Sequence, residues 1–221
     1  MKKLALAATL SFLFLFSAFL NAFQFEKSSL NYSFGIEKIK TRLYDFGINA
    51  SLDKWAYRYD AANMPPSPGV PSIEFNALEY WNISRYDNVY QIDAGGNVRH
   101  AAHRFVFTIY ENKSNITNLN IFWRGLGVYL LWWNGQYYII PSGSGIVIYA
   151  WNYTSSIYDE ILNTTSYNTV NLSTNISLDY ISSSGELTLL AEQRSTTFLF
   201  GWLRFYSVIA TDYVSVEVEY V

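Results

Sequence analysis

The sequence predicts an all-β protein, a sandwich or a barrel of antiparallel strands, and three observations indicate this class. Short apolar segments rich in aromatic residues recur along the chain, with turn-forming residues between them. Of the 221 residues, 19% are aromatic and only 15% are charged, whereas ordinary globular chains carry about 25% charged residues. The last segment alternates apolar and polar residues, which is the pattern of a strand with one wet face.

Residues 1–22 have the pattern of a secretory signal peptide that forms a helix. Lys2 and Lys3 precede an apolar run without charge, and Ala22 follows it. Cleavage after Ala22, or after Ala18, predicts an extracellular or cell-surface domain. An uncleaved leader would instead be a signal anchor, because an apolar run of about 20 residues can span a bilayer.

Glycosylation acceptor sequences, Asn-X-Ser/Thr, are more frequent than chance predicts. Nine of the 18 asparagines begin one, whereas the 36 Ser and Thr residues would give about three at random. Together with the leader and the absence of cysteine, this excess predicts a glycosylated protein of the cell envelope, of the archaeal type. The nine asparagines are Asn31, Asn49, Asn82, Asn112, Asn115, Asn152, Asn163, Asn171 and Asn175.

The composition argues against several classes of function. The formal net charge is −3, and without Lys2 and Lys3 of the leader 13 basic residues face 18 acidic ones, a net charge of −5. An acidic surface argues against nucleic acid as a partner, because phosphate binding needs a basic face. The absence of cysteine removes disulfides and thiol chemistry. Two histidines are too few for a three-histidine zinc site.

One sandwich domain with an N-terminal extension is predicted. Residues 63–72 hold four of the five prolines, and proline removes amide donors and fixes φ. We therefore assign residues 23–72 to an extension with a Pro-rich linker and residues 73–221 to the sandwich. A long loop inside a single domain is an equally weighted alternative for the proline-rich segment.

Strands are predicted from β-branched and aromatic runs and from the breaks between them. Gly145–Trp151 and Ile157–Leu162 flank a short polar break, which predicts a hairpin. Asn134-Gly135 predicts a second hairpin, because both residues accept positive φ. Along the last strand, Tyr213–Tyr220, the valines share one face and the glutamates the other. The remaining predicted strands are Ile73–Trp81, Asn88–Asp93, His103–Glu111, Leu119–Arg124, Leu126–Trp133, Gln136–Ile140, Glu186–Glu192 and Thr197–Tyr206, and Asn175–Ser182 is predicted to be a short helix.

The succession of segments resembles the C-terminal half of jelly-roll, galactose-binding-like sandwiches of exported archaeal and bacterial proteins. The resemblance rests on Gly145–Trp151, Ser156–Leu162, Leu178–Gly185, Glu186–Glu192 and Thr211–Val218, and covers roughly residues 75–221. It implies an antiparallel jelly-roll β-sandwich with at most one or two short helices besides the leader. Modules of this kind commonly bind carbohydrate or act as non-catalytic spacers in envelope proteins.

Carbohydrate binding is predicted at Trp132, Trp133 and Tyr137, which lie on either side of the Asn134-Gly135 turn. Sugars stack their C–H faces on flat aromatic rings. Adjacent rings on a strand point to opposite faces, so one of the two tryptophans is expected to face outwards. Trp123 and Trp151 are instead expected to fill the sandwich.

No catalytic constellation is predicted. His100 and His103 are assigned to a surface turn without metal, because residues three apart on a strand point to opposite faces. No cofactor is predicted, although the resemblance leaves open a structural calcium held by Asp87, Asp93 or Asp212. The acidic residues of interest are assigned to solvated turns and strand ends, and they are Asp87, Asp93, Asp159, Glu160 and Asp212.

These observations predict a non-enzymatic, exported, glycosylated β-sandwich of the cell envelope that is structural or contacts carbohydrate. Its expected partners are glycans, other envelope proteins or further copies of the chain, with membrane contact only through an uncleaved leader. The alternative is a subunit of an extracellular filament, in which residues 23–34 add as a strand to the sheet edge of a neighbour. A glycan-active enzyme is the third reading.

Overall fold

The structure, a computed structural model, describes residues 38–61, 65 and 72–221. Residues 39–221 form one compact unit. The predicted leader (1–22), the predicted donor strand (23–34), the sequon at Asn31 and most of the proline-rich segment lie outside the described residues.

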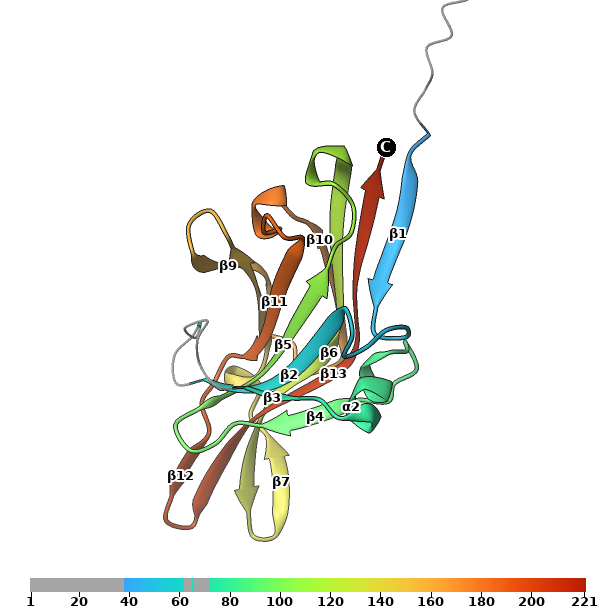
Figure 1. Cartoon of the computed structure of the whole chain (residues 1–221). Coiled ribbons are helices and arrows are strands. Elements are labelled where there is room, and N and C mark those ends of the chain that lie inside the picture. The colour runs from blue at the N-terminus through green and yellow to red at the C-terminus, as the bar shows by residue number, and fades with distance from the viewer. Residues whose placement is uncertain (1–37, 62–64, 66–71) are drawn as a thin grey trace, which may run out of the picture. The chain divides into compact units, whose positions relative to one another are not determined.

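Two antiparallel sheets build the compact unit (Figure 1), a seven-stranded sheet A and a six-stranded sheet B. Sheet A contains β1 (Lys40–Asp45), β4 (Gln91–Ala94), β6 (Ile116–Trp133), β7 (Gln136–Ile139), β10 (Val170–Asn175), β12 (Phe198–Phe200) and β13 (Leu203–Tyr220). Sheet B contains β2 (Lys54–Ala61), β3 (Ser72–Glu74), β5 (His100–Thr108), β8 (Ile146–Asn152), β9 (Ile157–Thr164) and β11 (Glu186–Gln193).

The strands pair in the order of a jelly roll. Four earlier strands pair in reverse order with four later ones: β8 with β9, β6 with β10, β5 with β11, and β1 with β13. This pairing rolls a long double ribbon into two facing sheets. The expected antiparallel jelly-roll sandwich is therefore confirmed, with β2 and β3 added to sheet B and β4, β7 and β12 added to sheet A.

β6 and β13 form the longest ribbon, with 18 residues in each strand. They pair from Ile116 opposite Tyr220 to Trp132 opposite Arg204. β12, β4 and β1 follow one another along the outer edge of β13, and β7 and β10 lie along the outer edge of β6. The sequence predicts a break between two strands at Gly125, but β6 runs through this residue without interruption.

The main core lies between the two sheets. The predicted central strand at 103–111 is β5, and it turns Phe105 and Phe107 inwards against β13. The alternation predicted for the last strand is confirmed, since Val214 and Val216 are fully buried and Glu217 is exposed. Burying one face of each sheet is what fixes the register of these strands.

Both predicted hairpins are confirmed. Asn134 and Gly135 have φ values of 47° and 81° and join β6 to β7, as a primed turn requires. β8 and β9 form the hairpin predicted within 145–162. The helix predicted at 175–182 is reduced to a single 3₁₀ turn, Leu178–Tyr180, because β10 continues to residue 175.

The strand predicted over Ile73–Trp81 is wrong beyond residue 74, because α2 (Ala77–Ile83) follows β3. The side chain of Asn76 accepts hydrogen bonds from the amides of Leu78 and Glu79, and the carboxylate of Glu79 accepts one from the amide of Asn76. This capping box satisfies amides that a helix start otherwise leaves without partners.

The folded unit begins before the predicted boundary at residue 73. β1 pairs with β13 in sheet A, and β2 pairs with β5 in sheet B. Residues 40–61 therefore belong to the sandwich and not to an extension. Local sequence did not indicate this, because the paired residues are 170 to 180 positions apart for β1 and β13 and 39 to 53 apart for β2 and β5.

Candidate functional site

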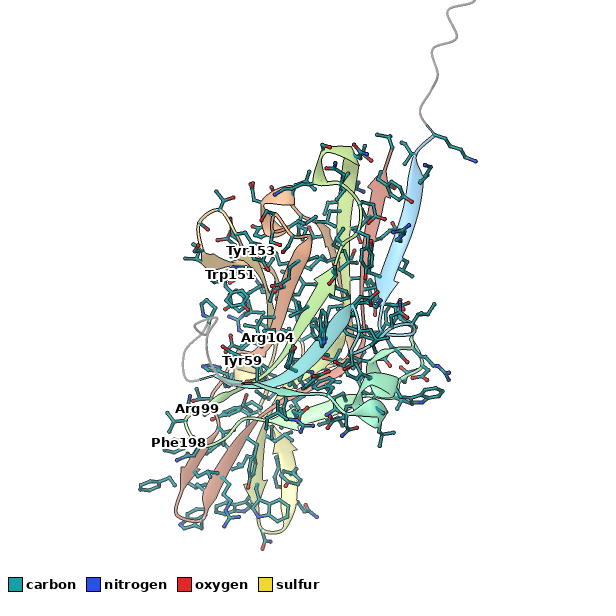
Figure 2. The ribbon with its side chains drawn as sticks, in the orientation of Figure 1. Tyr59, Arg99, Arg104, Trp151, Tyr153 and Phe198 are labelled. Carbon is teal, nitrogen blue, oxygen red and sulfur yellow. The ribbon has the colours of Figure 1, made fainter. Side chains whose placement is uncertain are left out.

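A groove of about 420 Å³ crosses the outer face of sheet B. Neighbouring residues of each strand point to opposite faces, so the residues that alternate with the core residues of β2, β5, β8 and β11 line this outer side. Figure 2 shows Tyr153, Trp151, Arg104 and Tyr59 one below another along this side. The lining residues are Trp55, Tyr57, Arg104, Val106, Trp151, Tyr153, Tyr158, Glu186 and Thr188.

Aromatic rings form the walls of the groove. The rings of Trp151 and Tyr158 meet edge to face, with centroids 5.1 Å apart and an interplanar angle of 72°. The guanidinium of Arg104 lies 4.8 Å from the ring centroid of Tyr57 and 5.3 Å from that of Tyr59. Both are cation–π distances. The contacts hold a cation over the middle of the sheet.

Hydrogen-bonding groups gather at one end of the groove. The Tyr153 hydroxyl donates to the Glu186 carboxylate at 2.6 Å and lies 3.4 Å from the Thr188 hydroxyl. The Tyr153 amide donates to the carbonyl oxygen of Asp179, which fixes the β8–β9 turn over the sheet. Burial, with the neighbouring Glu186, raises the pKa of Tyr153. This phenol therefore stays protonated at neutral pH and acts as a donor.

Beside the groove, the outer face of sheet B carries a small buried cluster. Glu192 lies on the same face of β11 as Thr188 and is fully buried, and neither of its carboxylate oxygens has a hydrogen-bond partner among the residues that the structure describes. Burial raises the pKa of Glu192 to about 8, so the carboxyl group is mainly protonated at neutral pH. The apolar residues of the cluster are Tyr59, Ala102, Val147, Tyr149, Tyr158 and Leu190.

This arrangement suits a ligand with both apolar and hydroxyl-bearing surfaces. Flat rings accept C–H faces, and the guanidinium of Arg104, the carboxylate of Glu186 and the hydroxyl of Thr188 are placed to bind hydroxyl groups. Glu186 is the single carboxylic acid among the lining residues that the structure describes. The groove offers recognition by stacking and hydrogen bonding.

A cavity of about 480 Å³ lies beside α2, but its polar groups already have partners. The Tyr80 hydroxyl accepts from the amide of Ala56 and donates to the carboxylate of Glu74. The guanidinium of Arg85 lies 3.6 Å from the ring centroid of Trp81. The groove of sheet B has five aromatic residues, one cation and one carboxylate in its described lining, and we place the candidate site there.

The three residues predicted to bind carbohydrate lie together, but outside the groove. They belong to what we call the aromatic tip, residues 130–139 of the β6–β7 hairpin and residues 198–206 of the β12–β13 hairpin (Figure 1). The ring centroids of Trp132 and Tyr137 are 4.6 Å apart. Trp133 and Tyr137 are exposed and Trp132 is half-buried, so the prediction that one of the two tryptophans faces outwards agrees with the structure.

The other tryptophans divide between core and groove. Trp123 is 2% exposed and fills the sandwich as expected, whereas Trp151 lines the groove and was misassigned to the core. Sequence reasoning also missed Trp55 and Tyr57. Their signal was present, because aromatic residues occupy alternate positions 55, 57 and 59 of one strand.

The assignment of His100 and His103 to a surface turn is wrong, since both are buried residues of β5. His103 is fully buried, with Nε2 2.9 Å from the Asp93 carboxylate and Nδ1 2.8 Å from the Thr211 hydroxyl. This hydrogen-bonded chain of Asp93, His103 and Thr211 has the acid, imidazole and hydroxyl groups of a catalytic triad in the same order, but the resemblance ends there. His103 and Thr211 are 0% exposed, so no substrate reaches them.

Two of the acidic residues assigned to solvated positions are instead paired with cations. Asp212 is fully buried, accepts from Arg124 and from the amide of Asn88, and is not a solvated strand end. Asp93 pairs with Arg58 as well as with His103. Asp159 accepts from Asn152 and Tyr180, Asp87 accepts from the amide of Val89, and Glu160 is exposed.

Within the described ranges, no three His, Cys, Asp or Glu residues are grouped to hold a metal.

The described sequons all reach the surface of the compact unit. Asn82 and Asn152 are half-buried, and Asn152 uses its side chain to hold the β8–β9 turn and Asp159. The six exposed asparagines are Asn49, Asn112, Asn115, Asn163, Asn171 and Asn175.

Comparison with known proteins places the folded unit in a family. Residues 51–220 match the family model AF_1625_C, described as an uncharacterized protein, C-terminal domain. No curated protein matches the chain. Over the residues described, no helix has the length and apolar character needed to cross a bilayer.

Proposed function

Because the chain belongs to the AF_1625_C family, whose description names no activity, we propose its function from the groove: it is a non-enzymatic, exported, glycosylated module of the cell envelope that binds carbohydrate. The observation that carries the proposal is the aromatic groove on the outer face of sheet B, with Trp151 and Tyr158 on one side and Tyr57 with Arg104 on the other.

The chemistry of the groove favours a sugar over a purely apolar ligand. Four of its rings, Trp55, Tyr57, Trp151 and Tyr153, are half-buried, so they are held in place and still present surface, and Tyr158 is buried behind them. Pyranose rings offer C–H faces for stacking and hydroxyl groups for charged and neutral partners. Tyr153, Glu186 and Thr188 supply these partners within one hydrogen-bonded cluster. Because these side chains already hold one another in place, binding a ligand costs them less conformational entropy.

The lining supports binding without hydrolysis. Glycoside hydrolysis generally uses two carboxyl groups, about 5 to 10 Å apart across the scissile bond. Among the described residues Glu186 is the one acid lining the groove, and its carboxylate already accepts from Tyr153. Glu192 is closed off from the surface. These features support a binding role, and the release of sugar from any bound glycan would contradict it.

Export and glycosylation are supported by sequence and by position. The leader pattern and the nine sequons point to a translocated chain. The eight sequon asparagines that the structure describes are exposed or half-buried, so enzymes have access to them. Mass spectrometry of the protein from its own cells tests this part, and unmodified asparagines at all nine positions would contradict it.

A glycan array followed by calorimetry tests the binding site. We expect Trp151→Ala and Tyr57→Ala to weaken binding about tenfold or more, because each removes a stacking ring. Trp133→Ala in the aromatic tip is the matched control and should leave binding unchanged. Circular dichroism checks that each variant folds.

Two results would contradict the assignment. Loss of binding with Trp133→Ala but not with Trp151→Ala would move the site to Trp132, Trp133 and Tyr137, as the sequence predicts. A folded protein that binds none of the glycans would leave the groove without the proposed ligand.

A further inference from the structure

The aromatic tip extends the β6–β13 ribbon beyond the region where the two sheets face each other (Figure 1). Four strands form it, in the order β7, β6, β13 and β12. Phe200, Trp202 and Tyr137 are 69%, 66% and 60% exposed, which for large apolar side chains in one place is unusual. A surface of this kind marks an interaction site.

Both faces of the tip are apolar. Residues directly opposite one another on neighbouring strands share a face. One row across the four strands consists of Tyr138, Leu131, Phe205 and Phe198, and the row on the other face consists of Tyr137, Trp132, Arg204 and Leu199. The tip therefore has the form of a wedge with large side chains on both sides, and in the part of the chain that the structure describes no second sheet covers either side.

The charge of the tip is opposite to that of the chain as a whole. Residues 127–145 and 193–209 contain no Asp or Glu, while Arg194 and Arg204 give these two segments a formal charge of +2. The whole chain has a formal charge of −3. Arg204 lies directly between Trp132 and Leu199 in its row. A cation among exposed rings complements anionic head groups.

Acceptor sequences for glycans avoid the tip. The asparagines of all nine sequons lie outside residues 116–151 and 176–221, the two segments that contain it. Glycans attached elsewhere on the unit would leave this end uncovered. Position, charge and exposure thus single out the same surface.

We propose that the aromatic tip is a lipid-docking site that inserts into the interface of an anionic membrane. Tryptophan and tyrosine prefer this interface, where the ring is buried and its polar atom stays wet. A rigid partner would have to clasp both faces of a wedge, whereas fluid lipid surrounds it without a matching shape. The occupant is therefore a lipid surface, in addition to the glycan groove on sheet B.

Quenching of tryptophan fluorescence by brominated lipid tests the proposal on the full chain. The leader contains no tryptophan, whereas the tip contains Trp132, Trp133 and Trp202, so anchoring through the leader alone gives no quenching. With vesicles of equimolar phosphatidylcholine and phosphatidylglycerol, we expect strong quenching of the wild type. Leu199→Ser/Phe200→Ser keeps every tryptophan and should weaken the binding that quenching reports about tenfold or more.

Matched controls separate insertion from a general loss of apolar surface. Ile48→Ser/Leu52→Ser changes two residues that are 73% and 75% exposed on a loop outside the tip, and it should leave quenching unchanged. Arg204→Gln should weaken binding to the anionic vesicles about fivefold and leave binding to pure phosphatidylcholine unchanged.

Three results would overturn the proposal. The first is a wild type whose fluorescence brominated lipid does not quench. The second is equal quenching in the wild type and in Leu199→Ser/Phe200→Ser. The third is a wild type that forms an oligomer in analytical ultracentrifugation and binds no vesicles, while Leu199→Ser/Phe200→Ser is a monomer. This result would mean that a second copy of the chain, and not lipid, contacts the tip. Trp151→Ala, the groove variant, should not affect quenching.

Discussion

His103 on β5 and Thr211 on β13 lie 2.8 Å apart, from imidazole Nδ1 to hydroxyl Oγ1, and their contact joins the two sheets inside the sandwich. The Asp93 carboxylate lies 2.9 Å from Nε2 and accepts a hydrogen bond from its N–H, so the unprotonated Nδ1 accepts one from the hydroxyl of Thr211. The indole Nε1 of Trp123 donates to the same hydroxyl at 3.2 Å. Each polar atom in this buried chain has a partner.

The buried histidine should make stability depend on pH. Burial lowers the pKa of His103 below its ordinary value of 6.5, although Asp93 opposes the shift. The unfolded chain therefore takes up a proton first as the pH falls, and the contribution of His103 to stability, complete above about pH 6.5, decreases below it. Urea unfolding between pH 7.5 and 5 should show this decrease in the difference between the wild type and a variant without His103, because Glu192 affects the wild type in the opposite direction over this range.

His103→Gln is the comparison for that measurement. The variant should be less stable throughout, because Asp93 and Thr211 lose a partner, and it should lack the part of the pH dependence that begins near pH 6.5. Equal pH slopes in the wild type and in His103→Gln would show that this side chain does not titrate on unfolding.

Glu192 should produce a pH dependence of the opposite sign. Burial raises its pKa from 4.5 to about 8 in the folded protein, so the folded state holds a proton that the unfolded state releases at lower pH. The contribution of Glu192 to the free energy of unfolding is therefore complete below about pH 4.5 and is lost as the pH rises towards 8. Glu192→Gln should therefore increase the free energy of unfolding at pH 8 by about 2 kcal/mol.

The experiment is a comparison of urea midpoints at pH 5 and pH 8. Glu186→Gln, on the same strand but exposed and hydrogen-bonded to Tyr153, is the control and should not show the gain. If Glu192→Gln were no more stable than the wild type at pH 8, the carboxylate would have an ionised partner within the fold.

Local patterns were enough to predict much of the fold. Asn134-Gly135 specifies a primed turn, and the alternation over 213–220 specifies a strand with one buried face, because both signals lie within a few residues. Where two local signals compete, pattern reasoning fails. The run after Ile73 reads as a strand, yet the capping box of Asn76 and Glu79 starts a helix there.

The candidate groove was beyond prediction for a different reason. Its lining residues run from Trp55 to Thr188 and come from separate strands and one turn. They meet only because β2, β5, β11 and β8 are neighbours in sheet B. The aromatic alternation at 55, 57 and 59 marks an outer face, but the sequence does not say which strands complete it. Trp132, Trp133 and Tyr137 were found together because one turn joins them.

The buried pair of Arg124 and Asp212 should be sensitive to the loss of one partner. Asp212 is 0% exposed, and Arg124 also donates to the side chain of Asn88 at 2.6 Å. Arg124→Met leaves a buried carboxylate without its cation, which costs about 3 to 5 kcal/mol of unfolding free energy. Arg99→Met, at an exposed position, should change stability by no more than about 0.5 kcal/mol.

A double variant separates charge from packing in that pair. Arg124→Met/Asp212→Asn removes both charges and should recover part of the stability lost in Arg124→Met. Urea unfolding of the wild type, the two single variants and the double variant gives the coupling. Additive losses would mean that the two side chains act independently.

Gly125 should be the residue that lets β6 run unbroken through the sandwich. A β-carbon at this position would lie well inside van der Waals contact with the carbonyl oxygen of Ala210 and with the ring of Trp123. Gly125→Ala should therefore lower the free energy of unfolding by about 1 to 3 kcal/mol, the range for overpacking. The measurement is the urea midpoint, with the slope checked for two-state behaviour.

Gly135→Asn provides the matched glycine control. Gly135 has a φ of 81° and open space around a β-carbon, and asparagine accepts positive φ. Its stability should stay within about 0.5 kcal/mol of the wild type. If Gly125→Ala were as stable as Gly135→Asn, then β6 and β13 would separate enough at Gly125 to admit a methyl group. The sequence prediction of two shorter strands, 119–124 and 126–133, would then describe this part of the sheet better.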